Sequence, residues 1–155
     1  MKKRIILACV LCITCLCLLV GCGASAAQND EQSKNRQYMT SVNSIMDTIK
    51  TDLEGFSDVV KSGEVVSLDS QLKDVQKQVE NLKALEAPED LKSVHESYVL
   101  GAEELQTALN EYVDLYQKMK LEGGSLNADS LASIQQHYDA GIAALKDADN
   151  KASQA

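Results

Sequence analysis

Apolar residues recur at intervals of three and four positions along most of the chain beyond residue 35. The first stripe comprises Tyr38, Val42, Ile45, Ile49, Leu53, Phe56 and Val60. This spacing places the side chains on one face of an α-helix and does not fit the alternation of a β-strand. The pattern predicts a helix over residues 35–61. Ser62-Gly63 marks its end, because glycine commonly follows the last turn of a helix.

A second helix is predicted over residues 67–86. Ser67 is the expected N-cap, and Asp69 lies in the first turn, where a negative charge is favoured. Ala87-Pro88 ends this helix, because a residue that precedes proline avoids helical dihedral angles. The inward positions are Leu68, Leu72, Val75, Val79, Leu82 and Leu85.

The third predicted helix is the longest and covers residues 88–121. Pro88 suits its first position, and Glu89 and Asp90 follow near the positive end of the helix dipole. Gly101 interrupts the stripe and indicates either a close helix contact or a bend, of which we favour the contact. The inward positions are Leu91, Val94, Tyr98, Ala102, Leu105, Leu109, Tyr112, Tyr116 and Met119.

Gly123-Gly124 separates the third helix from a fourth over residues 128–149, which Ser125 or Asn127 would cap. Counting back from this glycine pair places Gly141 opposite Ala108 on an antiparallel neighbour. Residues 151–155 are expected to fray. The inward positions of the fourth helix are Leu131, Ile134, Tyr138, Gly141, Ile142 and Leu145.

Four amphipathic segments with short connections predict an all-α domain over residues 35–150, with no strand signal anywhere. The expected architecture is an antiparallel up-down-up-down four-helix bundle. The near-heptad steps favour shallow, coiled-coil-like crossings between the helices.

The chain opens with a different pattern. Lys2-Lys3-Arg4 precedes a 16-residue segment, Ile5 to Val20, that is apolar except for Thr14, and Leu19-Val20-Gly21-Cys22 stands at its end. A basic start followed by an apolar run of this length is typical of a signal peptide. Leu19-Val20-Gly21-Cys22 resembles the lipobox of bacterial lipoproteins, in which the signal peptidase cuts before a cysteine that carries diacylglycerol.

This resemblance implies that residues 1–21 are a lipoprotein signal peptide and that Cys22 is the lipidation site. The two acyl chains would anchor the domain stably on the extracytoplasmic face of the cell membrane. The alternative is an uncleaved signal anchor, since no charged residue occurs between Ile5 and Ala27, and it places the domain on the same side. Residues 22–34 are small and polar and are expected to form a flexible tether.

Charge and cysteine content narrow the range of functions. Without the three basic residues of the leader, 12 basic and 23 acidic residues remain, a net charge of −11. Such a domain is repelled by phosphate backbones, so nucleic-acid binding is excluded. All five cysteines lie at or before Cys22. The Cys-x-x-Cys spacing among Cys9, Cys12 and Cys15 falls in the apolar run, where small hydrophobic residues are the better interpretation.

No catalytic motif follows the leader. His95 and His137 are the two histidines, and the expected register keeps them about 25 Å apart. A di-iron bundle would need glutamate three positions before each histidine, where Lys92 and Ile134 are found instead. Haem attachment, nucleophile-elbow and calcium-loop motifs are also absent. We therefore expect no cofactor and no enzymatic activity.

Tyrosines supply most of the aromatic content. Tyr112, Tyr116 and Tyr138 either complete the core or line a groove between the third and fourth helices. The segment from Leu82 to Leu109 is similar to a recurrent pattern in small uncharacterised lipoproteins of Gram-positive bacteria, which supports the same fold and compartment.

The leading hypothesis is a membrane-anchored binding or scaffold module for an envelope protein or peptide. The alternative is a small-ligand carrier or an accessory subunit of a transporter that uses a pocket between helices. An enzyme or metalloprotein centred on His95 or His137 is the third hypothesis and the least favoured.

Overall fold

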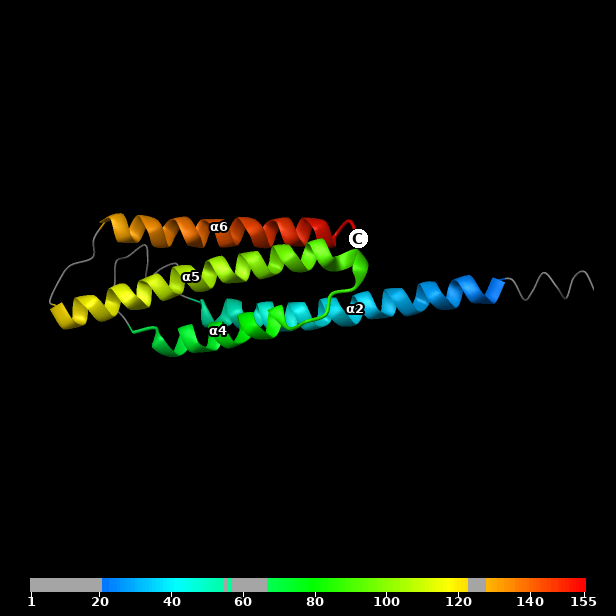
Figure 1. Ribbon diagram of the computed structural model, residues 1–155, viewed down its shortest axis with the longest axis horizontal. Coiled ribbons are helices and arrows are strands. Elements are labelled where there is room, and N and C mark those ends of the chain that lie inside the picture. Colours follow the sequence, from blue (N-terminus) through cyan, green and yellow to red (C-terminus); the bar gives the residue numbers. More distant parts are fainter. Residues whose placement is uncertain (1–20, 55, 57–66, 123–127) are drawn as a thin grey trace, which may run out of the picture. The chain divides into compact units, whose positions relative to one another are not determined.

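The computed structural model describes residues 21–54, 56, 67–122 and 128–155. The chain forms two compact units, residues 1–37 and residues 38–155. The described residues form four α-helices and one short 3₁₀ turn without strands, so the prediction of an all-α bundle is confirmed (Figure 1). None of the described helices is long and apolar enough to cross a membrane.

Helix α2 covers Gly21–Asp52, so it begins earlier and ends earlier than predicted. Residues 22–34, for which the sequence predicted a tether, are helical. The segment is rich in alanine and glutamine and contains no proline, so its backbone propensity is compatible with a helix. In the second unit, the α2 residues Tyr38, Val42 and Ile49 are buried as expected. The predicted end at Ser62-Gly63 lies outside the described residues.

Helix α4 covers Asp69–Lys83 and buries Leu72, Val75, Val79 and Leu82. The prediction of Ser67 as its N-cap is wrong. Leu68 occupies the N-cap position with no side-chain cap bond, while the Ser67 hydroxyl donates to the Asp69 carboxylate at 2.6 Å. The hydroxyl therefore satisfies a carboxylate instead of a backbone N–H, because the helix begins one residue later than the cap required.

Pro88 occupies the N-cap of the next element and not its first position as predicted, and the first turn is the tighter 3₁₀ turn η1, Glu89–Leu91. It leads directly into the long helix α5, Lys92–Glu122. The Leu91 N–H donates to the Pro88 carbonyl at 2.9 Å, which closes the turn. Contacts between α4 and α5 pair Lys83 with Glu103 and Asp69 with Gln117, so these two helices are antiparallel.

Helix α6, Ala128–Ala152, runs alongside α5 over most of its length (Figure 1). Tyr98 is bonded to Asp149 and Glu104 to His137, so residue numbers rise on α5 as they fall on α6 and the pair is antiparallel. The predicted caps Ser125 and Asn127 lie outside the described residues.

Two glycines lie at a close contact between α5 and α6. A Cβ atom on Gly101 would lie 3.1 Å from the Gly141 carbonyl oxygen and 2.6 Å from Leu145 Cδ2. The expected close contact at Gly101 is confirmed, but Gly141 lies opposite Gly101 and Leu105, not opposite Ala108 as predicted. The register places the two glycines together because residues without a side chain let the two backbones come this close.

The core of the second unit follows the stripes of α4 and α5 closely. Helix α6 differs, because the apolar residues Leu131, Tyr138, Ile142 and Leu145 are only half-buried, whereas Ile134 is fully buried. One side of the α6 stripe is therefore left without a covering helix face among the described residues.

Candidate functional site

A groove of about 770 Å³ lies against the uncovered side of α6. Its walls come from the last turns of α2 and from α6, and α5 supplies part of the lining. A volume of this size is within the range of ligand sites in proteins. The lining residues are Met46, Asp47, Ile49, Lys50, Thr51, Leu53, Glu54, Tyr98, Leu105, Tyr138, Ile142, Leu145 and Asp149.

Apolar residues line the groove along its length because each helix presents one side of its stripe to it. From α2 come Met46 and Ile49, and Leu53 follows directly after that helix, at steps of three and four residues. From α6 come Tyr138, Ile142 and Leu145, at steps of four and three. Helical spacing on two walls gives a surface that an elongated apolar partner can follow for several turns.

At one end of the groove, the lining residue Tyr138 belongs to a cluster of aromatic rings. The Phe56 ring packs edge-on against Tyr138, with centroids 6.1 Å apart, and against Tyr112, with centroids 5.7 Å apart. Phe56 is 2% exposed, so the cluster joins this end of the groove to the core. Edge-to-face packing holds the Tyr138 ring in a defined position as part of the groove wall.

A hydrogen bond between a tyrosine and a carboxylate marks the other end. The Tyr98 hydroxyl donates to Asp149 Oδ1 at 2.6 Å. Burial raises the pKa of Tyr98 above its usual value, and the bond to Asp149 raises it further. The bond holds one of the acidic groups of the lining at this end of the groove.

A second tyrosine of the bundle, Tyr38, is bonded to a histidine. The Tyr38 hydroxyl and His95 Nδ1 lie 2.7 Å apart in a hydrogen bond. Burial raises the pKa of Tyr38 to about 12. The two rings also meet edge to face, with centroids 6.0 Å apart. His95 thus joins α5 to α2 and takes no part in the His137 cluster described next.

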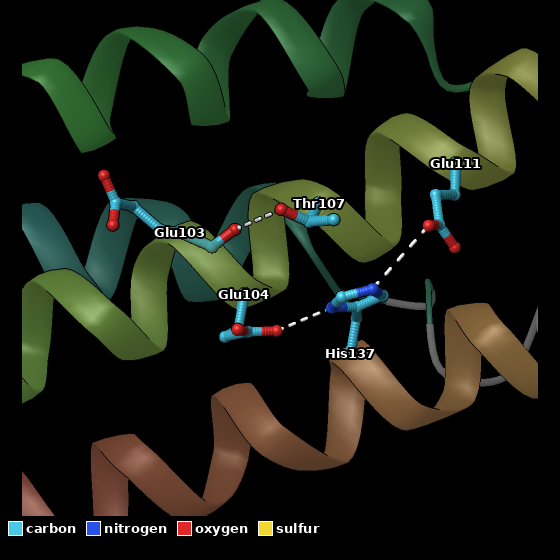
Figure 2. Close-up of polar contacts among 5 residues, drawn as sticks. All are labelled: Glu103, Glu104, Thr107, Glu111 and His137. Atoms are coloured by element: carbon cyan, nitrogen blue, oxygen red, sulfur yellow. Dashed lines mark hydrogen bonds and ion pairs between the residues drawn. The ribbon is translucent and has the colours of Figure 1, made fainter.

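His137 lies on a different side of α6 from the groove, between two glutamates of α5 (Figure 2). Its Nδ1 is 2.6 Å from Glu104 Oε2 and its Nε2 is 3.7 Å from Glu111 Oε1. The carboxylates approach different ring nitrogens, so they do not converge on one point as ligands of a metal ion would. Among the described residues, no group of three histidine, cysteine or acidic side chains has a geometry that could hold a metal.

The neighbouring Glu103 is directed to the other side of α5 (Figure 2). Its carboxylate pairs with Lys83 of α4 at 3.0 Å, and its backbone carbonyl accepts a hydrogen bond from Thr107. Glu103 and Glu104 therefore connect α5 to different helices, which is a structural use of adjacent acids.

The three tyrosines that the sequence singled out are separated in the structure. Tyr138 lines the groove, Tyr112 is 2% exposed within the core, and Tyr116 is half-buried against that core. The groove lies between α2 and α6 and not at Tyr112 and Tyr116, because Phe56 covers Tyr112. Cys22 is the second residue of α2, while Leu19 and Val20 lie outside the described residues.

Of the residues that line the groove, the sequence had assigned only Tyr138 to a groove, and Tyr98, Leu53 and Asp149 are among those it missed. It placed Tyr98 and Leu53 on core stripes, and their spacing does not distinguish a covered stripe from an uncovered one. Asp149 was placed at the last position of the fourth helix with no role. In the structure Asp149 lines the groove and accepts a hydrogen bond from Tyr98.

The described residues therefore define a small all-α bundle with an apolar groove and no assembled metal site. A family model matches residues 32–146, most of the chain, and the chain belongs to that family, DUF6376, a family of unknown function. Neither the curated proteins nor the solved structures contain a match to this chain.

Proposed function

We propose that this protein is a lipid-anchored module on the extracytoplasmic face of the cell membrane, and that it binds a segment of another envelope protein or a peptide without catalysing a reaction. The groove between α2 and α6 is the observation that carries the proposal. Large apolar side chains remain accessible there along several helical turns.

The anchor is supported by the lipobox resemblance at Leu19-Val20-Gly21-Cys22 and by the basic and apolar segments before it. A diacylglyceryl group on Cys22 provides two acyl chains, which suffice for stable attachment to a bilayer. The acidic bundle that follows is repelled by anionic headgroups, so its groove is directed to proteins or peptides and not to the lipid surface.

The binding role is supported by the chemistry of the groove. Leucine, isoleucine, methionine and tyrosine side chains supply the contact area. Each Å² of such apolar surface that a partner buries favours association by about 25 cal/mol. The titratable side chains in the lining other than tyrosine are Asp47, Lys50, Glu54 and Asp149. They lie at exposed positions, where they can orient a partner but are not held together as a catalytic pair.

A small-ligand carrier is the second candidate, favoured by the groove volume of about 770 Å³, which would accommodate a drug-sized molecule. Native mass spectrometry of the purified chain distinguishes a small-ligand carrier from a module that binds a protein or peptide. A carrier retains a small molecule of constant mass, and the variant Ile142→Glu loses it.

Two measurements test the main proposal in cells. Membrane fractionation should show the wild-type chain in the membrane and Cys22→Ala as an unprocessed precursor, whereas unchanged processing of the variant would contradict the anchor. A photo-crosslinking residue at Ile142 should give a discrete protein adduct. The same residue at the exposed Asp139 of α6 is the matched control, and equal labelling from both positions, or none from Ile142, would contradict a groove-directed partner.

A further inference from the structure

The charges around the groove are unequal. Asp47, Glu54 and Asp149 are acidic and Lys50 is basic, so the rim has a net charge of −2. All four are at exposed positions, so they remain available to a partner. The whole chain carries −8, and its long-range field has the same sign as the rim. A second copy of this chain would therefore meet like charge at the groove, whereas a basic partner would meet opposite charge.

The acidic groups are distributed along the length of the groove. Asp149 lies at the end where it accepts a hydrogen bond from Tyr98. Glu54 lies two residues before Phe56, whose ring meets Tyr138 at the other end. Along α6 the lining extends from Tyr138 to Asp149, about 16 Å of helix. An occupant that meets both ends needs positive charges about three helical turns apart.

The walls also restrict the backbone of the occupant. The lining of the groove belongs almost wholly to helices, whose backbone N–H and C=O groups are already bonded within each helix. An extended peptide would find no backbone partners on such walls and would lose hydrogen bonds to water. A helical segment satisfies its own backbone and presents only side chains.

On this basis we propose that the groove binds a cationic amphipathic α-helix of about three to four turns. Its apolar stripe packs along the partly exposed Met46, Leu53 and Ile142, and its lysine or arginine side chains face Glu54 and Asp149. The inference rests on the proposed binding function and adds the chemistry of the partner.

The test uses the full chain in nanodiscs of phosphatidylcholine and a set of fluorescent peptides of about 14 residues, the length of such a helix. The main probe contains leucine and lysine, with leucines at helical spacing. One control has the same composition with leucine and lysine alternating. Two others keep the helical spacing and replace lysine with glutamine or glutamate. Fluorescence anisotropy gives each dissociation constant, and empty nanodiscs provide the background.

The helical leucine–lysine peptide should bind tightest, the glutamine peptide about 10-fold more weakly, and the glutamate peptide without saturation. Glu54→Gln and Asp149→Asn should each weaken binding of the lysine peptide up to about 5-fold, since single exposed ion pairs contribute little. The amide that replaces the carboxylate in Asp149→Asn keeps an oxygen that can accept the bond from Tyr98. Asp139→Asn, an exposed acid of α6 outside the groove lining, is the matched control and should change nothing.

The possible negative results separate a wrong partner chemistry from a wrong binding function. If the glutamine peptide binds as tightly as the lysine peptide and the acid variants bind normally, the cationic partner is refuted while the binding groove stands. Equal binding of the alternating peptide refutes the helical partner. If no peptide binds above empty nanodiscs, or if Ile142→Glu with a normal circular dichroism spectrum binds all of them unchanged, the proposed function fails as well.

Discussion

The glycine contact between α5 and α6 makes a quantitative prediction about stability. Replacement of either Gly101 or Gly141 with alanine adds one methyl group at a point where the two backbones are close. Alanine is favoured over glycine in a helix by about 1 kcal/mol. Overpacking of a tight contact costs about 1–3 kcal/mol. The sign of the change depends on how easily the neighbouring side chain moves.

The two positions differ in this respect. Each Cβ would lie about as close to the facing glycine carbonyl, so the side chains make the difference. A Cβ on Gly101 would meet Leu145 Cδ2 at 2.6 Å, and Leu145 is half-buried beside the groove, where it has room to turn away. A Cβ on Gly141 would meet Leu105 Cγ at 2.8 Å and the Gly101 carbonyl at 3.0 Å, and Leu105 is only 3% exposed. We expect Gly101→Ala to be close to neutral and Gly141→Ala to destabilise by about 1–2 kcal/mol.

Urea unfolding followed by circular dichroism measures both variants. Ala143→Gly, at an exposed position of α6, calibrates the propensity effect and should cost about 1 kcal/mol. Removal of the clashing side chain in Gly141→Ala with Leu105→Ala should give a double variant more stable than the sum of the single changes. If Gly141→Ala stabilises the protein as much as propensity alone predicts, and the double variant is additive, the close contact is refuted.

Buried and charged groups support three further predictions. Burial raises the pKa of Tyr38 to about 12, so the Tyr38 hydroxyl ionises at a lower pH in the unfolded chain than in the folded one. The stability that this group confers is therefore present below about pH 10 and is lost as the pH rises through about 12. Tyr38→Phe should reduce this loss in urea unfolding measured at alkaline pH. Hydrogen bonds from Lys151 and Ser97 lower the pKa of Asp147, so the stabilising effect of its carboxylate is present at neutral pH and is lost in acid. In thermal unfolding, Asp147→Asn should be less stable than wild type at about pH 7 and equally stable at about pH 2. Phe56→Ala should cost about 3–5 kcal/mol in urea unfolding because its ring is 2% exposed, and Tyr138→Ala, which opens toward the groove, should cost less than half as much; equal losses would contradict the groove.

The sequence determined the helices because helical spacing of apolar residues is a local property. The stripes of residues 67–86 and 88–121 correspond closely to α4 and to η1 with α5, and Pro88 separates them as its fixed backbone requires. The local pattern also indicated that Gly101 lies at a close contact. The ends of the helices were less certain, because capping depends on a single residue, as Ser67 and Leu68 illustrate.

The groove was decided by the tertiary structure alone. A stripe shows which side of a helix is apolar, but whether a second helix covers that side depends on how several helices pack. Leu72 and Ile142 are indistinguishable by spacing, yet the first is buried in the core and the second lines the groove. The separation of Tyr138 from Tyr112, and the position of Asp149 beside Tyr98, depend on residues that lie on different helices and far apart in the chain, which no local pattern encodes.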